Sequence, residues 1–211
     1  MCPKIATKNM KNRIAAIFAQ EADAIKNIPI TDEFEKATIL IKEQVHQKGG
    51  KLITSGMGKA GQIALNIATT FSSTGTPAVF LHPSEAQHGD LGIIQKNDLM
   101  LLISNSGKTR EIVELYHLSK RLNPDLKYIG ISSNPEGEFR DFCDAFLYTG
   151  NPKEVCKLGL CPTTSTTIMT VIGDALLVEM MDQIHFTNEE YAKRHHGGYL
   201  GEKSRAQCKD K

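Results

Sequence analysis

The chain has 211 residues and a formal net charge of +1, because its 25 basic and 24 acidic side chains nearly balance. That balance excludes the strongly basic surface that nucleic-acid binding requires, so a small molecule is the expected partner. The sequence offers no apolar run of about 18 residues to span a bilayer and no apolar signal-peptide core near its start. We therefore expect a cytoplasmic protein without membrane contact.

The length suits one well-buried α/β domain, and no Pro-, Gly- or Ser-rich linker divides the chain. Residues 1–211 are therefore predicted to form a single domain. The five cysteines are odd in number and contain no Cys-x-x-Cys pair, so disulfides are not expected. Cys156 and Cys161 are predicted to be ordinary buried thiols rather than zinc ligands.

Two helices open the predicted structure, because apolar residues recur at helical spacing over 9–27 and again over 32–48. After the Gly49-Gly50 turn, the pattern changes to short apolar runs without alternation, typical of strands covered on both faces. These predicted strands lie at 51–55, 78–82, 99–104, 127–132 and 145–149.

Segments of helical period, such as 59–73 and 110–122, separate the predicted strands. This alternation predicts an α/β fold with a doubly wound parallel five-stranded sheet and helices on both faces. A last pair of helices is expected at 165–185 and 188–194. The polar tail after Gly201 is expected to be loose.

Polar side chains follow three of the predicted strands, at 55–64, 82–92 and 104–109. Ligands of doubly wound sheets bind at the carboxyl ends of the strands, near the point where the strand order reverses. The sequence therefore predicts a binding site at this edge of the sheet.

The first polar segment, "SGMGKAGQIA", contains the spacing Gly56-x-Gly58-x-x-Gly61. A lysine lies inside this glycine spacing and no acidic residue ends the next predicted strand, so the motif is weak evidence for a dinucleotide site. The motif also lacks the glycine spacing of a P-loop. A glycine turn that brings backbone N–H groups and Lys59 towards a polar ligand is one interpretation. A tight turn with an exposed lysine is the other.

The segment "SNSGKT" offers the hydroxyls of Ser104, Ser106 and Thr109 just before a predicted helix. Hydroxyls and the N-terminal end of a helix both suit the oxygens of a phosphate, so we predict a phosphate-binding loop here. The alternative needs no ligand: Ser106 caps the helix and Thr109 occupies its third position.

Two groups of histidines could carry acid–base chemistry. His82 and His88 flank Glu85 and could act on a substrate, bind a metal or simply cap a helix. His195 and His196 end a predicted helix, where a cation can also satisfy the helix C-terminus.

Six segments in this order resemble the sugar isomerase (SIS) domain family, and within it the arabinose 5-phosphate isomerases. They are "ITSGMGKAGQIA", "SSTGTPAVFLHPSEAQHGDLG", "ISNSGKTREI", "PKEVCKLGLCPTTSTT", "GDAL" and "AKRHHGGYLG". The resemblance extends from about residue 10 to residue 203. It implies a SIS fold and reversible conversion of D-ribulose 5-phosphate to D-arabinose 5-phosphate through a cis-enediol, for synthesis of 3-deoxy-D-manno-octulosonate and lipopolysaccharide.

Two other functions stay open. The same fold also serves regulators that bind a sugar phosphate without catalysis, and related isomerases act on other phosphosugars. A regulator would need the phosphate-binding loop but not the acid–base groups.

The resemblance also implies roles for individual residues. Catalytic roles would fall on Lys59, Glu111, Glu154 and His195, and substrate contacts on Ser55, Gly75, Thr76, His82 and His88, in addition to Ser104, Ser106 and Thr109. In that scheme Glu111 is the candidate base, His195 or His88 handles ring opening, and Lys59 stabilises negative charge. The family usually reads His-Pro-Gly-Gly where this chain reads His195-His196-Gly197-Gly198, so His196 remains an alternative to His195.

No cofactor is expected, although a divalent metal at His82 could inhibit the enzyme. The CBS domain pair that commonly follows the SIS domain in the family is expected to be missing. Feedback would then act on the SIS domain itself, and a downstream nucleotide-activated octulosonate is the expected competitor at the sugar-phosphate site.

A homotetramer is expected, because the predicted helix at 165–185 carries more apolar surface than one sheet face can cover. The apolar residues concerned are Ile168, Met169, Val171, Ile172, Leu176, Leu177 and Met180.

Overall fold

A computed structural model describes residues 3–209, with side chains described from residue 9 to residue 207. It confirms a parallel five-stranded sheet, with strand order β2-β1-β3-β4-β5. The strands are β1 (Leu52–Gly56), β2 (Ala78–Phe80), β3 (Leu99–Ile103), β4 (Lys127–Ser132) and β5 (Ala145–Tyr148). They lie where the apolar runs of the sequence predict them.

Strand β1 lies between β2 and β3, and Ile53 pairs with Val79 on one side and Met100 on the other. The chain therefore adds β2 at one side of β1 and β3, β4 and β5 at the other. Such a reversal leaves a crevice outside the carboxyl ends of the two central strands. Here the crevice falls between β1 and β3.

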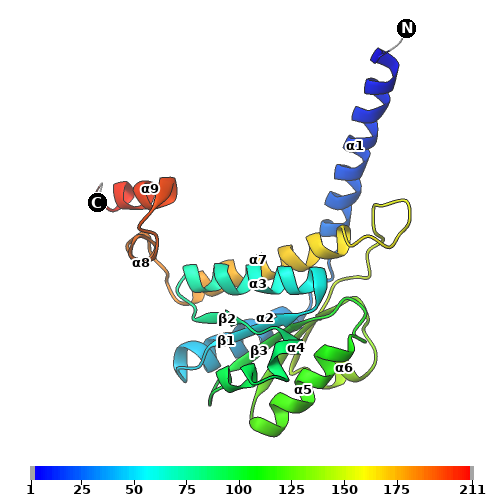
Figure 1. Cartoon of the computed structure of the whole chain (residues 1–211). Coiled ribbons are helices and arrows are strands. Elements are labelled where there is room, and N and C mark those ends of the chain that lie inside the picture. Colours follow the sequence, from blue (N-terminus) through cyan, green and yellow to red (C-terminus); the bar gives the residue numbers. More distant parts are fainter. Residues whose placement is uncertain (1–2, 210–211) are drawn as a thin grey trace.

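The sheet is covered on both faces, as predicted (Figure 1). Helices α2, α3 and α7 pack on one face, and α4, α5 and α6 pack on the other. The helices are α1 (Pro3–Lys26), α2 (Asp32–Ile41), α3 (Gly58–Ser73), α4 (Pro83–Ala86), α5 (Arg110–Leu122), α6 (Glu138–Asp141), α7 (Thr164–Gln183), α8 (Asn188–Arg194) and α9 (Gly198–Lys209). A π-helical turn (Lys42–Gln47) extends α2, and a 3₁₀ turn spans Asp90–Ile93.

Alternate residues of the central strands feed two separate cores. Leu101 and Ile103 of β3 pack with α3 and α7, whereas Met100 and Leu102 pack with α5, and all four are fully buried. Because successive side chains point to opposite faces, a strand buried on both faces must be apolar without alternation. This explains the uninterrupted apolar runs of the sequence.

Two parts of the chain extend away from this body: α1 at one end, and α8 with α9 at the other (Figure 1). Helix α1 contacts α7 near its own C-terminal end but leaves Met10, Ile14, Ile17 and Phe18 exposed. Among the described residues, none of these helices combines the length and apolar character needed to cross a bilayer.

The prediction of a loose tail was wrong, because the residues after Gly201 continue helix α9. Ser204 is buried and its Oγ donates a hydrogen bond to the carbonyl of Gly201 (3.1 Å). The Arg205 guanidinium donates to the carbonyls of His195 and His196, each at 3.3 Å. The Arg205 contacts join α9 to the end of α8, and we refer to α8 and α9 together as the C-terminal arm.

The predicted source of oligomer contacts was also wrong. Of the apolar residues of α7 named above, Val171 is half-buried, and the others are buried within the chain. Unfilled apolar surface lies instead in a groove of about 890 Å³ between α2, the end of α1 and α7. Ile30, which is 88% exposed, and Ile39 line this groove.

Candidate active site

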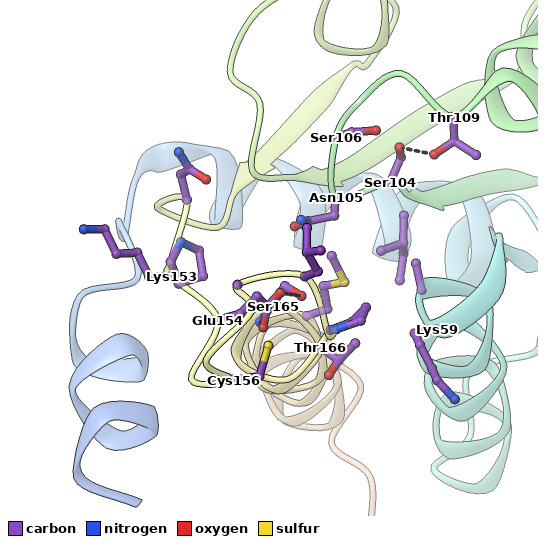
Figure 2. Close-up of a pocket in the computed structure, with 18 of the residues that line it drawn as sticks. Lys59, Ser104, Asn105, Ser106, Thr109, Lys153, Glu154, Cys156, Ser165 and Thr166 are labelled. Atoms are coloured by element: carbon purple, nitrogen blue, oxygen red, sulfur yellow. Dashed lines mark hydrogen bonds between the residues drawn. The ribbon is translucent and has the colours of Figure 1, made fainter. Parts of the chain in front are cut away.

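A cavity of about 720 Å³ opens at the carboxyl edge of the sheet, at the crevice between β1 and β3. Four segments line it: the start of α3, the loop from β3 to α5, residues 151–162, and the start of α7 (Figure 2). The position agrees with the site predicted from the polar ends of the strands. Of the predicted site residues, it brings together Lys59, Ser104, Ser106, Thr109 and Glu154.

The loop from β3 to α5 presents hydroxyl groups to the cavity beside the N-terminus of α5. The Oγ of Ser104 lies 2.8 Å from the Oγ1 of Thr109, and the Oγ of Ser106 accepts the backbone N–H of Lys108 (3.1 Å). Gly107 adopts φ +64°, a left-handed conformation that glycine accepts readily and that turns the loop towards α5.

The capping alternative for Ser106 is excluded by where the helix starts. Helix α5 begins at Arg110, so Thr109 is its N-cap residue, and the Thr109 side chain makes no capping hydrogen bond. The N–H groups of the first turn of a helix have no partners within the helix. Together with the loop hydroxyls, they suit an anion.

Lys59 lies in the first turn of α3, after a glycine turn in which Gly58 has φ +56°. Its side chain is exposed, lines the cavity and reaches the Oε1 of Gln62 at 3.4 Å. A Cβ on Gly56 would lie 2.8 Å from the carbonyl carbon of Ala60, so glycine is required for the strand to meet the helix this closely. The turn thus combines both interpretations of the sequence: it is tight, and it places a lysine at the cavity.

Glu154 is held against the N-terminus of α7. Its Oε2 accepts the backbone N–H and the Oγ1 of Thr163 at 2.7 and 2.8 Å, and its Oε1 accepts the hydroxyl of Ser165. Partial burial alone would raise the pKa of Glu154, but the hydrogen bonds from Ser165 and Thr163 outweigh it and hold the pKa below its usual value. Glu154 is therefore an ionised carboxylate that ties the cavity loop to α7.

Two lysines that the sequence analysis did not single out also line the cavity, Lys153 and Lys157. Both are exposed and flank Glu154 in the motif "PKEVCK". With Lys59 they give the cavity three cationic side chains, against the single carboxylate of Glu154, among the described lining residues. The clustering of lysines around one acidic residue was the available signal, and it favours an anionic ligand.

The cysteines near the cavity are not buried thiols, and that prediction was wrong. Cys156 is half-buried at the cavity wall, and Cys161 is exposed. Among the cysteines that the structure describes, the buried thiol is Cys143, whose pKa burial raises to about 12.

Ser55, Gly75 and Thr76 do not line the cavity in a single chain. The Oγ of Ser55 is fully buried and donates to the carbonyl of Leu81 (2.6 Å). Gly75 and Thr76 precede β2 and so lie at the amino edge of the sheet, opposite the cavity. There the Oγ1 of Thr76 is buried and paired with Nε2 of His46 (3.0 Å).

His82 and His88 follow β2 at the carboxyl edge, but neither lines the cavity. His82 precedes α4, and its Nδ1 is buried without a hydrogen-bond partner; His88 is exposed. The described residues contain no group of three His, Cys, Asp or Glu side chains placed to hold a metal. An inhibitory metal at His82 therefore stays a prediction, for which the described residues of one chain supply no further ligand group.

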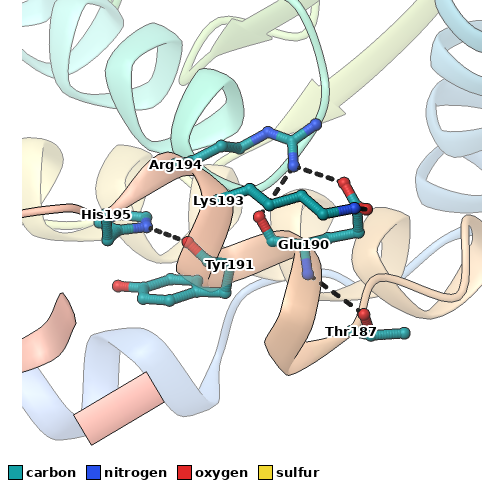
Figure 3. A network of polar contacts seen from close by, with 6 residues as sticks. All are labelled: Thr187, Glu190, Tyr191, Lys193, Arg194 and His195. Carbon is teal, nitrogen blue, oxygen red and sulfur yellow. Dashed lines mark hydrogen bonds and ion pairs between the residues drawn. The ribbon is translucent and has the colours of Figure 1, made fainter. Parts of the chain in front are cut away.

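His195 is the C-cap of α8 and interacts with its own arm (Figure 3). Its Nδ1 lies 3.0 Å from the carbonyl of Tyr191, and its ring stacks on the Tyr191 ring with centroids 3.7 Å apart. The arm follows the C-terminus of α7, whereas the cavity lies at the N-terminus of α7, and a helix of 20 residues spans about 30 Å. A single chain thus keeps His195 far from Glu154.

Glu111 also lies outside the cavity lining. It is half-buried in the first turn of α5, two residues beyond Thr109. Among the described lining residues there is no histidine either. One chain therefore brings Lys59 and Glu154 together with groups that suit an anion, but not Glu111 or His195.

Comparison with known proteins agrees with the fold. The SIS domain family matches residues 44–179. An arabinose 5-phosphate isomerase, KdsD, of Yersinia pestis is 47% identical over 174 residues, covering 82% of this chain and 51% of the relative. The chain thus spans about half the length of this curated relative.

Two solved structures are similar over nearly the whole chain. A Bacteroides fragilis protein, described as a candidate phosphosugar isomerase involved in capsule formation, is 65% identical with a TM-score of 0.89, covering 90% of this chain and 99% of that one. An Escherichia coli CFT073 protein in complex with arabinose 5-phosphate is 31% identical with a TM-score of 0.78, covering 92% of this chain and all of that one (100%). The chain described here belongs to the SIS domain family.

Proposed function

We propose that the protein is an aldose–ketose isomerase that interconverts D-ribulose 5-phosphate and D-arabinose 5-phosphate. The observation that carries this proposal is the group of hydroxyls at the N-terminus of α5, inside a cavity with three lysines. The names of the curated relatives and the Escherichia coli neighbour with its bound arabinose 5-phosphate support the substrate class.

In this proposal the phosphate binds between Ser104, Ser106 and Thr109, where hydroxyls and free N–H groups of α5 donate to its oxygens. Lys59 at the start of α3 lies across the cavity from this loop (Figure 2). It stabilises the negative charge that develops on the sugar oxygens as the cis-enediol forms. Phosphate binding, remote from the reacting carbons, supplies energy that orients the sugar.

The proton transfer requires groups that one chain does not bring to the cavity. We propose that His195 of a second copy enters the cavity and handles ring opening or the hydroxyl protons. The arm that carries His195 extends away from the body, which supports a role towards another copy (Figure 1). The exposed apolar residues of α1 and the groove beside α7 support a homotetramer in which several surfaces are shared.

The activity is tested by proton NMR of the purified protein with D-ribulose 5-phosphate. Anomeric signals of D-arabinose 5-phosphate are expected, and they should disappear when Lys59 is replaced by alanine. Binding without any new sugar signal would favour the alternative of a sugar-phosphate-binding regulator.

The shared site is tested by combining two inactive variants. Lys59→Ala and His195→Ala protomers, co-expressed with different tags and purified as mixed oligomers, should regain activity, because some sites then receive both intact residues. Mixed oligomers as inactive as either parent would show that each chain uses its own His195.

Glu111 remains the candidate for the C1/C2 base, as the resemblance implies. The variant Glu111→Gln decides this, since loss of a general base typically costs about 10²–10⁴ in turnover. Full activity would remove Glu111 from the mechanism.

The proposed product supplies 3-deoxy-D-manno-octulosonate synthesis, and a nucleotide-activated octulosonate is the proposed inhibitor. Its phosphate and acid groups suit the same hydroxyls and lysines. Inhibition kinetics at several substrate concentrations test this: competitive inhibition supports it, and no inhibition at millimolar inhibitor contradicts it.

A further inference from the structure

The turn between Cys156 and Cys161 brings an exposed thiol, Cys161, close to the Cys156 thiol, which lines the cavity. The N–H of Gly159 donates to the carbonyl of Cys156 (3.0 Å), and the N–H of Cys161 donates to the Sγ of Cys156 (3.3 Å). Gly159 adopts φ +64°, which lets the chain reverse within this short segment. The sulfur of Cys156 therefore lies beside the backbone from which the Cys161 side chain projects.

The backbone around the Cys156 sulfur favours its thiolate form. The backbone N–H of Cys161 has the largest effect and lowers the pKa of Cys156; desolvation opposes it, and the N–H groups of Leu160, Leu158 and Gly159 lower the pKa further. Cys143 is the internal contrast, because burial raises its pKa and keeps its thiol protonated. The two environments predict that Cys156 reacts with electrophiles far faster than Cys143.

We propose that Cys156 and Cys161 form a peroxide-sensitive thiol pair that closes to a disulfide at the mouth of the cavity. The Cys156 thiolate attacks one oxygen of a peroxide, the O–O bond breaks, and the leaving hydroxide takes a proton to become water. The Cys161 sulfur, losing its thiol proton, attacks the resulting sulfenic acid; the S–O bond breaks, and the leaving hydroxide takes that proton to become a second water. Two thiols and one hydrogen peroxide thus give one disulfide and two waters.

The pair suits a reversible reaction more than a structural crosslink. A disulfide between residues this near in sequence closes a short loop and adds little entropic stabilisation to the fold. Cys161 is exposed, so reductants can reach the bond. Once it is part of a disulfide, the sulfur of Cys156 is no longer a charged acceptor for the N–H of Cys161. Both cysteines lie between Glu154 and Thr163, whose hydrogen bond ties the cavity loop to α7, so the disulfide would alter this loop.

The experiment is peroxide treatment of the full chain, followed by trypsin digestion without reductant and mass spectrometry. Lys157 lies between the two cysteines, so trypsin separates residues 154–157 from residues 158–193. The proposal expects these two peptides to remain joined, with the loss of two hydrogen atoms, and to separate after dithiothreitol. Cys143 should stay unmodified in the same digest.

Two variants keep the test decisive. In Cys161→Ser, Cys156 should stop at the sulfenic acid, which dimedone traps; in Cys156→Ser, Cys161 should remain a thiol under the same treatment. Equal oxidation of Cys161 in the Cys156→Ser variant, or a wild-type digest without the joined peptides, would overturn the proposal.

The effect on the cavity is measured on the same samples. Turnover of D-ribulose 5-phosphate should fall as the joined peptides appear and recover with dithiothreitol. If the disulfide forms with turnover unchanged, the pair is redox-active but the coupling to the cavity is wrong. Binding of D-arabinose 5-phosphate to the oxidised protein serves as a readout if the chain proves inactive.

Discussion

The cavity at the carboxyl edge and the C-terminal arm hold different halves of the proposed chemistry, and they are built differently. The cavity groups sit at the ends of buried strands and at the starts of α3, α5 and α7, so the core of one chain positions them. The arm packs chiefly within itself, through the Tyr191–His195 stack and the Arg205 contacts. Substrate binding and proton transfer should therefore respond separately to substitutions in the two regions.

The largest difference between the effect on turnover and the effect on substrate binding is expected for His195→Ala. Turnover should fall by about 10²–10⁴, the usual contribution of a general acid or base, while KM and the thermal midpoint change little, because the contacts of His195 within the described part of its own chain are to its own arm. Steady-state kinetics and thermal unfolding measure both effects. His196→Ala is the matched control and should keep wild-type turnover; the reverse result would assign the role to His196.

The converse change is Ser104→Ala combined with Ser106→Ala at the cavity. Each hydrogen bond to a charged phosphate is worth roughly 1.5–3 kcal/mol, so KM should rise at least tenfold for each one lost, with a smaller effect on kcat. Thr69→Ala removes an exposed hydroxyl of α3 that bonds only to helix carbonyls, and it should leave KM unchanged. An unchanged KM in the double variant would show that the loop does not bind phosphate.

Gly75→Ala tests the difference between the cavity and the C-terminal arm from the side of the arm, because Gly75 contacts the segment from which the arm begins. A Cβ at Gly75 would come within 2.8 Å of the Phe186 ring, and φ is +93° there. The Phe186 ring also contacts Tyr191 edge-on and lies under the Arg194 guanidinium.

We expect the Gly75→Ala variant to lose about 1–2 kcal/mol of stability from backbone strain and to lose turnover through the displaced arm, with KM for the phosphate little affected. Unfolding by urea and steady-state kinetics measure these effects. A rise in KM without a change in stability would instead support the substrate contact that the family resemblance implies for Gly75.

The smallest effect is expected for Glu154→Gln, and it should depend on pH. The pKa of Glu154 is depressed in the folded state, so its stabilisation is present above the unfolded value near 4.5 and is lost as the pH falls through the folded pKa. At neutral pH the variant should lose about 1 kcal/mol or less, since the carboxylate is partly exposed. This corresponds to a midpoint lower by roughly 2–4 °C.

Calorimetry at several pH values tests this prediction. The difference between wild type and Glu154→Gln should shrink below pH 4.5. A difference that stays constant down to strongly acidic pH would mean that the Glu154 charge does not hold the loop.

Much of the fold could be predicted from the sequence, because the signals are local and repeated. Apolar runs without alternation mark strands buried on both faces, and helical spacing marks the segments between them. The tail was missed because α9 is polar and depends on contacts with the end of α8, such as Arg205 with His195. The sequence predicted exposed apolar surface on α7, but most of the apolar residues on which that prediction rests pack against the sheet, α3 and parts of α1 and α2, and so are buried.

The sequence by itself determined which groups cluster at the carboxyl edge. Lys59, Ser104, Ser106 and Thr109 each lie within a few residues of a strand end, and parallel strands must bring those ends to one edge. Connectivity alone is enough for this result.

Only the tertiary structure decided which of the remaining residues reach the cavity. Glu154 faces it because Thr163 and Ser165 hold its carboxylate at the start of α7, whereas His195 is removed from it by the length of that helix. Cys156 became a candidate reactive thiol because the turn folds back until backbone N–H groups point at its sulfur. Such placements depend on contacts between segments that packing and loop closure bring together, and no spacing of residue types along the chain specifies them.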